Sequence, residues 1–162
     1  MSKPRPHLFD LNNPVHLIAC GFGSGLAPKA PGTFGTLAAI PFWFALQMLD
    51  KPLYWLVVAL AFALGVYVCD RTARDIGVQD HGGLVWDEFV GVWVALACVP
   101  LDWFWVILGF ALFRLLDIWK PWPIRWCDRN VHGGFGVMLD DLIAGFGALG
   151  LLLLLQYGYA SR

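Results

Sequence analysis

Residues 142–161 read LIAGFGALGLLLLLQYGYAS and carry no charged side chain. Two more charge-free apolar runs of similar length occupy residues 30–49 and 52–69. A helix needs about 20 consecutive, mostly apolar residues to cross the hydrocarbon core of a bilayer. The three runs therefore predict membrane-spanning helices, and this prediction decides the fold class.

Between the second and third runs lies a further apolar stretch, residues 84–118, which Pro100 and Asp102 interrupt. Proline and a charged residue at the centre predict two helical arms joined by a turn. Either both arms cross a locally thinned bilayer, or the hairpin is re-entrant. Both alternatives return the chain to the side of the membrane that it left.

The composition agrees with a membrane protein. Hydrophobic residues make up 59% of the chain, charged residues 14%, and the mean hydropathy is +0.64, whereas soluble domains average about 45–50% apolar and about 25% charged residues. We expect an all-α fold, a polytopic membrane helical bundle with about three to five hydrophobic helices. Residues 1–162 would form one domain, with residues 1–13 as a flexible tail. The alternative is a soluble all-helical protein with an acidic surface.

Charge excludes one class of partner and predicts an orientation. The net charge of −1 leaves no basic footprint for nucleic acid. Membrane proteins keep their basic residues on the cytoplasmic side. A cytoplasmic N-terminus places nine of the eleven Lys and Arg residues on that side, namely Lys3, Arg5, Lys29, Arg71, Arg74, Arg114, Lys120, Arg125 and Arg129. Trp86 would then lie at the inner interface and Tyr54 at the outer one.

Acidic residues stand at the cytoplasmic ends of the apolar runs. Asp87 and Glu88 open one run, Asp117 closes another, and Asp140 and Asp141 precede the last. An unpaired charge in apolar surroundings is costly. Five carboxylates at matching ends therefore predict a shared site for a cation, and a divalent metal is the usual ligand of such a site.

Simpler explanations cover part of this pattern. Acids in the first turn of a helix complement its dipole, which accounts for a pair such as Asp87 and Glu88. Asp117 is different, because it stands near the predicted C-terminus of a helix. Arg114 lies one turn before it and Lys120 one turn after it on the same face. Asp117 is therefore either a structural ion-pair partner or a metal ligand.

A glycine-rich segment, GFGSGLAPKAPGTFGT at residues 21–36, precedes the first long run. Glycines let the backbone approach a ligand, and Thr33 or Thr36 could cap the following helix. A helix N-terminus suits phosphate, and Lys29 adds positive charge. The other interpretation is an ordinary connector, since the segment is not a Walker loop.

A second basic segment, WKPWPIRWCDR, covers residues 119–129. Its Lys120, Arg125 and Arg129 could hold phosphate. Alternatively, three tryptophans among basic residues suit a segment that lies in the membrane interface. His81 and His132, each before a glycine pair, could transfer protons or stabilise turns.

Residues 21–41, 80–91, 114–134 and 140–145 together resemble the phosphatidylglycerophosphatase A family of bacteria. The most specific matches are VWDEF at residues 85–89 and DIWKPWPIR at residues 117–125. The resemblance implies a magnesium-dependent lipid phosphatase of phospholipid biosynthesis. Its anionic substrate would be phosphatidylglycerophosphate, which loses its terminal phosphate to give phosphatidylglycerol. The resemblance also implies a multihelical fold shared with soluble relatives. The apolar runs and the charges predict a multi-pass protein of the bacterial cytoplasmic (inner) membrane, and the positions of the acids predict an active site that faces the cytoplasm.

The residues themselves suggest a matching mechanism. Glu88, Asp117 and Asp141, with Asp87 or Asp140, would bind one or two Mg²⁺ ions. The substrate phosphate would meet Lys29, Thr33, Lys120, Arg125 and Arg129. Water attack and an aspartyl-phosphate intermediate both remain open. Two other classes also remain, a membrane cation transporter, whose acids should face one another near the bilayer midplane, and a non-catalytic scaffold.

Overall fold

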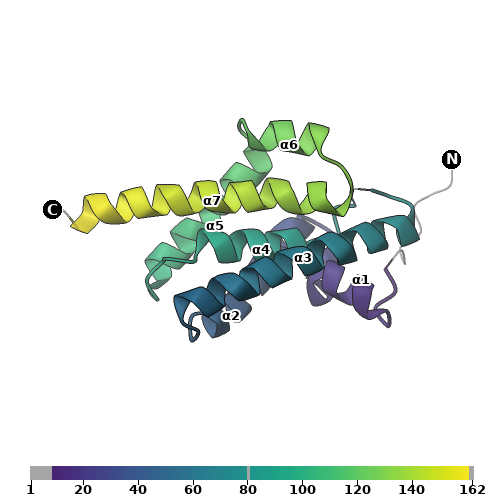
Figure 1. Cartoon of the computed structure of the whole chain (residues 1–162), viewed down its shortest axis with the longest axis horizontal. Coiled ribbons are helices and arrows are strands. Elements are labelled where there is room, and N and C mark those ends of the chain that lie inside the picture. Colours follow the sequence, from purple (N-terminus) through teal and green to yellow (C-terminus); the bar gives the residue numbers. More distant parts are fainter. Residues whose placement is uncertain (1–8, 80, 161–162) are drawn as a thin grey trace.

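The computed structural model describes residues 9–79 and 81–160 (Figure 1). Every regular element in these ranges is a helix, which confirms the all-α prediction. The elements are α1 (Pro14–Ala19), the 3₁₀ helix η1 (Gly21–Leu26), α2 (Pro31–Leu46), α3 (Lys51–Ile76), α4 (Trp86–Ala95), α5 (Trp103–Trp119), α6 (Ile124–Asn130) and α7 (Gly133–Ala160).

Helix α4 forms the centre of the bundle, and α2, α3, α5 and α7 all pack against it (Figure 1). Its residues are buried on every side except at Asp87, as expected for a helix that is apolar all round. A helix of 10 residues is roughly 15 Å long, whereas a bilayer core is about 30 Å thick. The first arm of the predicted hairpin is therefore too short to cross a bilayer core of that thickness, and its helix is buried within the protein.

Helices α4 and α7 run parallel and touch at two glycines. A Cβ atom at Gly145 would overlap the carbonyl oxygen of Gly91, and one at Gly91 would lie 3.0 Å from the carbonyl oxygen of Asp141. Only glycine allows the two backbones to approach so closely. Asp87 lies one turn before Gly91, and Asp141 lies one turn before Gly145. The crossing therefore brings these carboxylates together.

Buried aromatic side chains join the helices through polar contacts. The indole nitrogen of Trp86 donates to the carbonyl of Ala61 at 3.0 Å, and the hydroxyl of Tyr54 donates to the carbonyl of Trp93 at 2.6 Å. Each polar group thus finds a partner inside the protein. Trp86 and Tyr54, expected at the two membrane interfaces, are both buried in the core, so neither side chain faces lipid in this structure.

Two helices are long and apolar enough to cross a membrane. They are α3 and α7, with mean hydropathies of 2.1 and 2.0 over their most apolar stretches. Only 33% and 44% of those stretches are buried within the protein, so most of each is available to lipid. Helix α2, expected to span from the run at residues 30–49, is shorter, with 16 residues and Pro41 inside it. Among the described residues the structure thus offers two candidate spans, where the three long apolar runs predicted three.

The tail predicted at residues 1–13 falls partly outside the described residues, which begin at Phe9. From there the chain stays exposed over residues 10–12, but two contacts tie it to the fold. The ring of Phe9 meets that of His81 edge-on at 5.2 Å, and the Asp10 amide donates to Nδ1 of His16 at 3.1 Å.

Candidate active site

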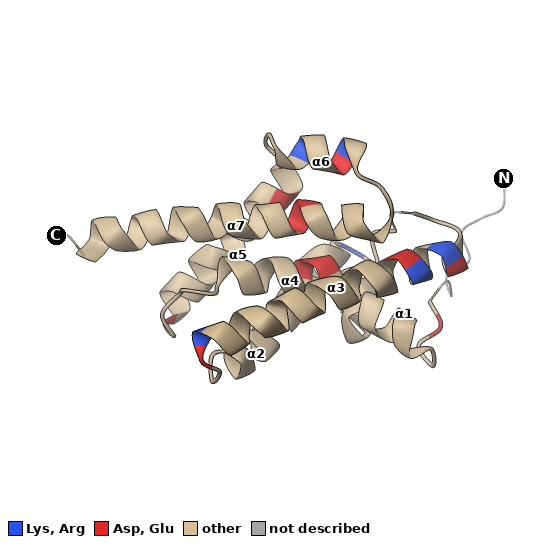
Figure 2. Ribbon diagram, viewed as in Figure 1, with Lys and Arg blue, Asp and Glu red and all other residues tan. Residues whose placement is uncertain are grey.

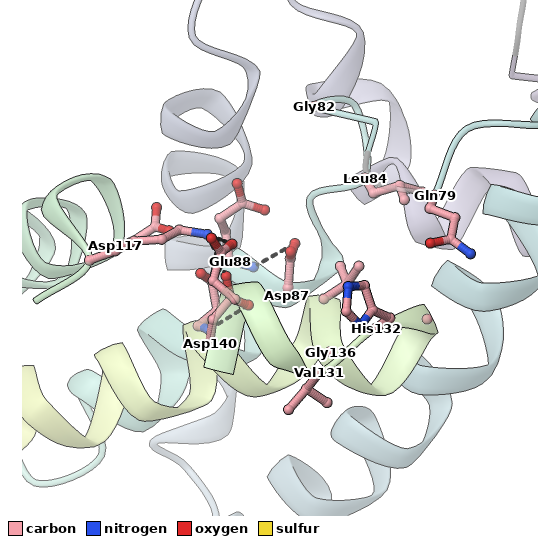
Figure 3. A pocket seen from close by; sticks show the side chains of 15 residues that line it. Gln79, Gly82, Leu84, Asp87, Glu88, Asp117, Val131, His132, Gly136 and Asp140 are labelled. Atoms are coloured by element: carbon pink, nitrogen blue, oxygen red, sulfur yellow. Dashed lines mark hydrogen bonds and ion pairs between the residues drawn. The ribbon is translucent and has the colours of Figure 1, made fainter. Parts of the chain in front are cut away.

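The five acids singled out in the sequence line one cavity of about 190 Å³ (Figure 3). Helix α4 contributes Asp87 and Glu88, α5 contributes Asp117, and α7 contributes Asp140 and Asp141. The remaining lining side chains and backbone come from Gln79, Gly82, Leu84, Lys120, Asp128, Val131, His132, Gly133, Gly136 and Val137. The structure therefore brings together the carboxylates that the sequence placed at separate helix ends.

Helix dipoles do not explain the acids of α7. This helix begins at Gly133, so Asp140 and Asp141 lie about two turns inside it. The influence of the dipole fades within the first turn. The sequence interpretation, in which these acids mark the start of the helix, is wrong. Asp87 and Glu88 do stand in the first turn of α4, where the carboxylate of Asp87 accepts from the Glu88 amide at 3.0 Å.

Three of the carboxylates are placed as metal ligands would be. Asp87, Glu88 and Asp141 can each offer one oxygen atom such that all three lie within 4.8 Å of one another. In addition, Oε2 of Glu88 and Oδ2 of Asp141 are buried without a hydrogen-bond partner in the protein. Leaving such atoms unsatisfied is costly. A hard divalent cation prefers carboxylate oxygens, so this donor set fits Mg²⁺.

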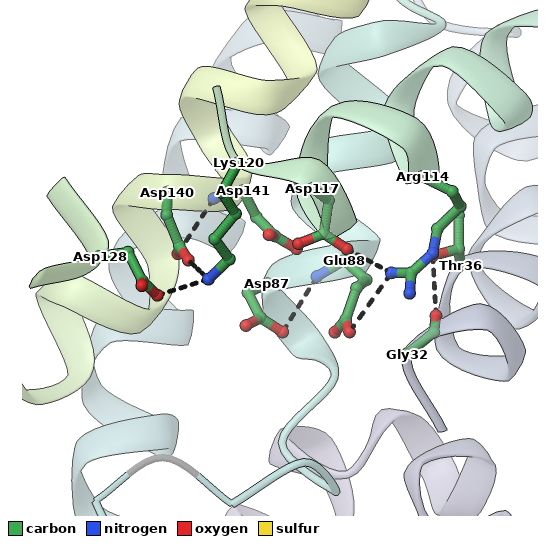
Figure 4. Close-up of polar contacts among 10 residues, drawn as sticks. All are labelled: Gly32, Thr36, Asp87, Glu88, Arg114, Asp117, Lys120, Asp128, Asp140 and Asp141. Carbon is green, nitrogen blue, oxygen red and sulfur yellow. Dashed lines mark hydrogen bonds and ion pairs between the residues drawn. The ribbon is translucent and has the colours of Figure 1, made fainter. Parts of the chain in front are cut away.

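Arg114 lies beside the carboxylates (Figure 4). Its Nη1 is 2.6 Å from Oδ2 of Asp117 and 3.7 Å from Oε1 of Glu88, and its side chain is only 13% exposed. Asp117 is therefore both an ion-pair partner and part of the cavity wall. Gly32 of α2 closes this side, because a Cβ atom there would overlap Oε1 of Glu88. The close backbone approach predicted for the glycine-rich segment is thus made to the acid cluster.

Lys120 joins α6 and α7 at the cavity. Its Nζ lies 2.5 Å from Oδ1 of Asp128 and 2.6 Å from Oδ2 of Asp140. Burial lowers the pKa of Lys120, but its hydrogen bonds to the two carboxylates outweigh burial and leave the pKa raised. Sequence reasoning missed Asp128, because it belongs to a helix of 7 residues that is too short to show a periodic pattern.

The carboxylates on α4 hold protons more tightly than usual. Burial, reinforced by the neighbouring Glu88, raises the pKa of Asp87 well above its ordinary range. Burial likewise raises the pKa of Glu88 to about 8, and the charges of Asp141 and Asp117 add to this effect. A metal ion would favour the deprotonated forms, since it supplies the positive charge that the cluster lacks.

Several predicted site residues do not line the cavity. Lys29 is exposed in the connector before α2, and Thr33 is half-buried in the first turn of that helix. The predicted capping by Thr33 or Thr36 is wrong, because Ala30 occupies the N-cap and no side chain caps the helix. The hydroxyl of Thr36 instead donates to the carbonyl of Gly32 at 2.8 Å.

Among the other basic residues and the two histidines, some line the cavity and others do not. Arg125 is exposed and donates to the carbonyl of Trp119 at 3.1 Å, and Arg129 is also exposed on α6. His81 accepts from the Gly83 amide at 3.0 Å, a contact that stabilises the turn. His132 does line the cavity. Of the predicted phosphate and proton groups, the structure therefore places Lys120 and His132 at the acids.

Fold and cavity together define an all-helical protein with two candidate membrane spans and a cavity lined by a cluster of carboxylates. The family model described as Phosphatidylglycerophosphatase A matches residues 17–156. The chain belongs to the phosphatidylglycerophosphatase A family.

Two relatives are similar over most of their length. The protein named Phosphatidylglycerophosphatase A from Escherichia coli (strain K12) is 59% identical over 143 residues, which cover 88% of this chain and 83% of the relative. The protein of the same name from Haemophilus influenzae is 49% identical over 149 residues, 91% of each chain. No solved structure matches this chain.

Proposed function

We propose that this chain is a lipid phosphatase that hydrolyses the terminal phosphate monoester of phosphatidylglycerophosphate. The products would be phosphatidylglycerol and inorganic phosphate, as a step in phospholipid biosynthesis. The names of the relatives at 59% and 49% identity support the activity. The structural observation that carries the proposal is the triad of Asp87, Glu88 and Asp141, the last two buried, in the cavity that Lys120 also lines. The transporter and scaffold alternatives receive no support from these relatives.

Magnesium is the proposed cofactor. Asp87, Glu88 and Asp141 would hold it, with Asp117 and Asp140 completing the carboxylate shell. When bound, Mg²⁺ would neutralise phosphoryl charge and lower the pKa of a bound water. The two buried oxygen atoms without partners, on Glu88 and Asp141, support this assignment.

The side chains of the protein would bind and orient the substrate. Lys120 would bind the phosphate, exchanging part of its contact with Asp128 and Asp140 for the phosphate oxygens. His132 would donate a proton to the leaving alcohol oxygen. Arg114 would keep Glu88 and Asp117 in place. The nucleophile is either water or an aspartate, and hydroxylamine added during turnover separates the two. An aspartyl phosphate is an acyl phosphate, so hydroxylamine would convert that aspartate to its hydroxamate, whereas direct attack by water leaves every carboxylate unchanged.

Phosphate release from purified protein tests the activity. With phosphatidylglycerophosphate and Mg²⁺ we expect steady release, which excess EDTA stops and added Mg²⁺ restores. Absence of release with Mg²⁺ present would refute the phosphatase. Full turnover in excess EDTA would refute the metal site while leaving the phosphatase intact.

The proposed location is the bacterial cytoplasmic membrane, with α3 and α7 spanning it and the cavity facing the cytoplasm. The basic residues from α3 to α6 support this orientation, because Lys51 would lie on the outer side and six others on the cytoplasmic side, namely Arg71, Arg74, Arg114, Lys120, Arg125 and Arg129. Single cysteines at Lys51 and Asn130, in a background without the four native cysteines, provide the test. In intact right-side-out vesicles an impermeant thiol reagent should label position 51 but not position 130. Labelling of position 130 in those vesicles would reverse the orientation.

A further inference from the structure

The segment that follows α5 carries a surface that the proposed chemistry does not use. Its outward side chains are Trp119, Trp122, Arg125, Trp126 and Arg129, called here the α6 face. The three tryptophans are 65%, 83% and 56% exposed. Figure 2 shows charged residues on α6, in contrast to the long uncharged stretches of α3 and α7.

The α6 face is basic and aromatic because the two apolar side chains of α6 outside it turn inward. Ile124 and Cys127 are buried on the side that packs against α7. Asp128, the acid of this helix, is partly exposed, but its charge is paired with Lys120 at the cavity. Two arginines and three indoles are therefore left outside, and the carboxylate of α6 is paired elsewhere.

This combination matches the headgroup layer of an anionic bilayer. Indole rings favour the membrane–water interface, where the ring is sheltered and its N–H group stays hydrated. Guanidinium groups bind phosphate in a bidentate manner. Trp122 is 83% exposed, and so large an apolar ring is unfavourable in water. In hydrocarbon, its indole N–H group would lack a hydrogen-bond partner. The interface satisfies both requirements, and negative lipid headgroups complement the two arginines.

We propose that the α6 face binds the anionic headgroup layer of the bilayer and does not bind the substrate phosphate in the cavity. The membrane setting of this inference rests on the proposed function. Lys120 and Asp128 connect α6 to the cavity, so a helix lying along the headgroups would hold the cavity at the depth of a lipid phosphate. Arg125 and Arg129, which do not line the cavity, would thereby dock the protein on the headgroup layer.

The depth of a spin label measures this contact directly. We would replace Trp126 by cysteine in the background without native cysteines, label it, and reconstitute the protein in phosphatidylcholine vesicles with or without phosphatidylserine. Access to oxygen and to a water-soluble nickel complex then reports depth. The label should reach headgroup depth with phosphatidylserine and move toward water without it.

The double variant Arg125→Gln/Arg129→Gln should abolish this difference between the two vesicle types. Arg71→Gln/Arg74→Gln on α3 is the matched control, because it removes two exposed charges elsewhere and should preserve the difference. A label that stays in water in both vesicle types would overturn the proposal. A label shielded from both reagents would also overturn it, and would indicate contact with a second protein copy or another protein.

Activity on a short-chain, water-soluble substrate in neutral detergent separates docking from chemistry. If the Arg125→Gln/Arg129→Gln variant loses as much phosphate release in detergent as in anionic vesicles, the arginines belong to substrate binding and the docking proposal is wrong. A greater loss in vesicles than in detergent supports docking. Failure of the unmodified protein to release phosphate in either setting would refute the proposed function, whereas the label depths would still decide the docking.

Discussion

Gly32 lies directly against the carboxylate of Glu88, although the two residues belong to different helices (Figure 4). A Cβ atom at position 32 would overlap Oε1 of Glu88 and lie 3.0 Å from Nη1 of Arg114. Because residue 32 has no side chain, the first turn of α2 packs directly against one side of the carboxylate cluster.

Gly32→Ala should displace Glu88 and impair the site without weakening the helix. Alanine has a better intrinsic helix propensity than glycine by about 1 kcal/mol. We expect phosphate release to fall at least about tenfold, roughly 1.4 kcal/mol in the barrier, and the Mg²⁺ requirement to rise. Gly150→Ala on α7 is the control, since nothing lies within 4 Å of its added Cβ. Equal activity of the two variants across a Mg²⁺ series would contradict the steric role of Gly32.

Arg114→Gln should destabilise the metal-free protein. The change leaves the carboxylate of Asp117 without its cation at 2.6 Å, and breaking a buried pair costs about 3–5 kcal/mol. Saturating Mg²⁺ should recover part of the loss, because the metal supplies positive charge to the same carboxylate cluster. Thermal unfolding in detergent with EDTA or Mg²⁺ measures both effects. Arg71→Gln, at a side chain that is 60% exposed, should change little. A loss at Arg114 that is independent of Mg²⁺ would argue against a shared metal site.

Glu88→Gln, Asp117→Asn and Asp141→Asn should each reduce the turnover rate by at least about 100-fold, roughly 3 kcal/mol of barrier. Each change removes a charge while preserving the size of the side chain. Asp75→Asn tests the opposite case, since this residue pairs with Arg71 and His16 away from the cavity. It should retain nearly full turnover. Unchanged turnover of Asp117→Asn would mean that Asp117 serves Arg114 alone.

The pKa of Glu88 predicts how pH affects the metal-free protein. It rises from an ordinary value of 4.5 to about 8 on folding, so the folded state binds more protons than the unfolded state between those values. Stability must then fall as pH increases through this window. Metal binding expels the protons, so the apparent affinity for Mg²⁺ should increase over the same range.

Melting temperatures at about pH 6 and about pH 8.5 test this linkage. In EDTA the midpoint should be lower at the higher pH, and saturating Mg²⁺ should remove or reverse the difference. An EDTA midpoint that increases with pH would contradict a protonated Glu88 in the metal-free protein.

The fold class could be predicted because runs of apolar residues are visible in the sequence. How deeply each helix is buried within the protein could not be predicted. Run length does not distinguish a membrane arm from a core helix, and α4 proved to be the latter. The start of α7 was misplaced because Asp140 and Asp141 interrupt the apolar run. The close approach of α4 and α7 at Gly91 and Gly145 positions Asp141 beside Asp87. This is a tertiary contact, and it leaves no periodic pattern in the sequence.

The acids were recognisable because carboxylates are rare in so apolar a chain. The phosphate-binding residues were harder to predict from the sequence, since residues that are close in sequence can point in different directions. Lys120 faces the acids, whereas Arg125, only five residues later, is exposed on the outer side of α6. Which side of a seven-residue helix is buried depends on its packing against α7, and local sequence does not encode that choice.

The parallel contact between α4 and α7 also sets the order in which the protein can mature. A ribosome makes α7 after α4, so Asp87 and Glu88 are complete long before Asp141 exists. Until α7 arrives, α4 is too short to reside in a bilayer as an independent span, and its Gly91 surface has no cover. Chains cut short before α7 would present that bare apolar surface to cellular proteases, so the synthesis of α7 protects a surface that was made earlier.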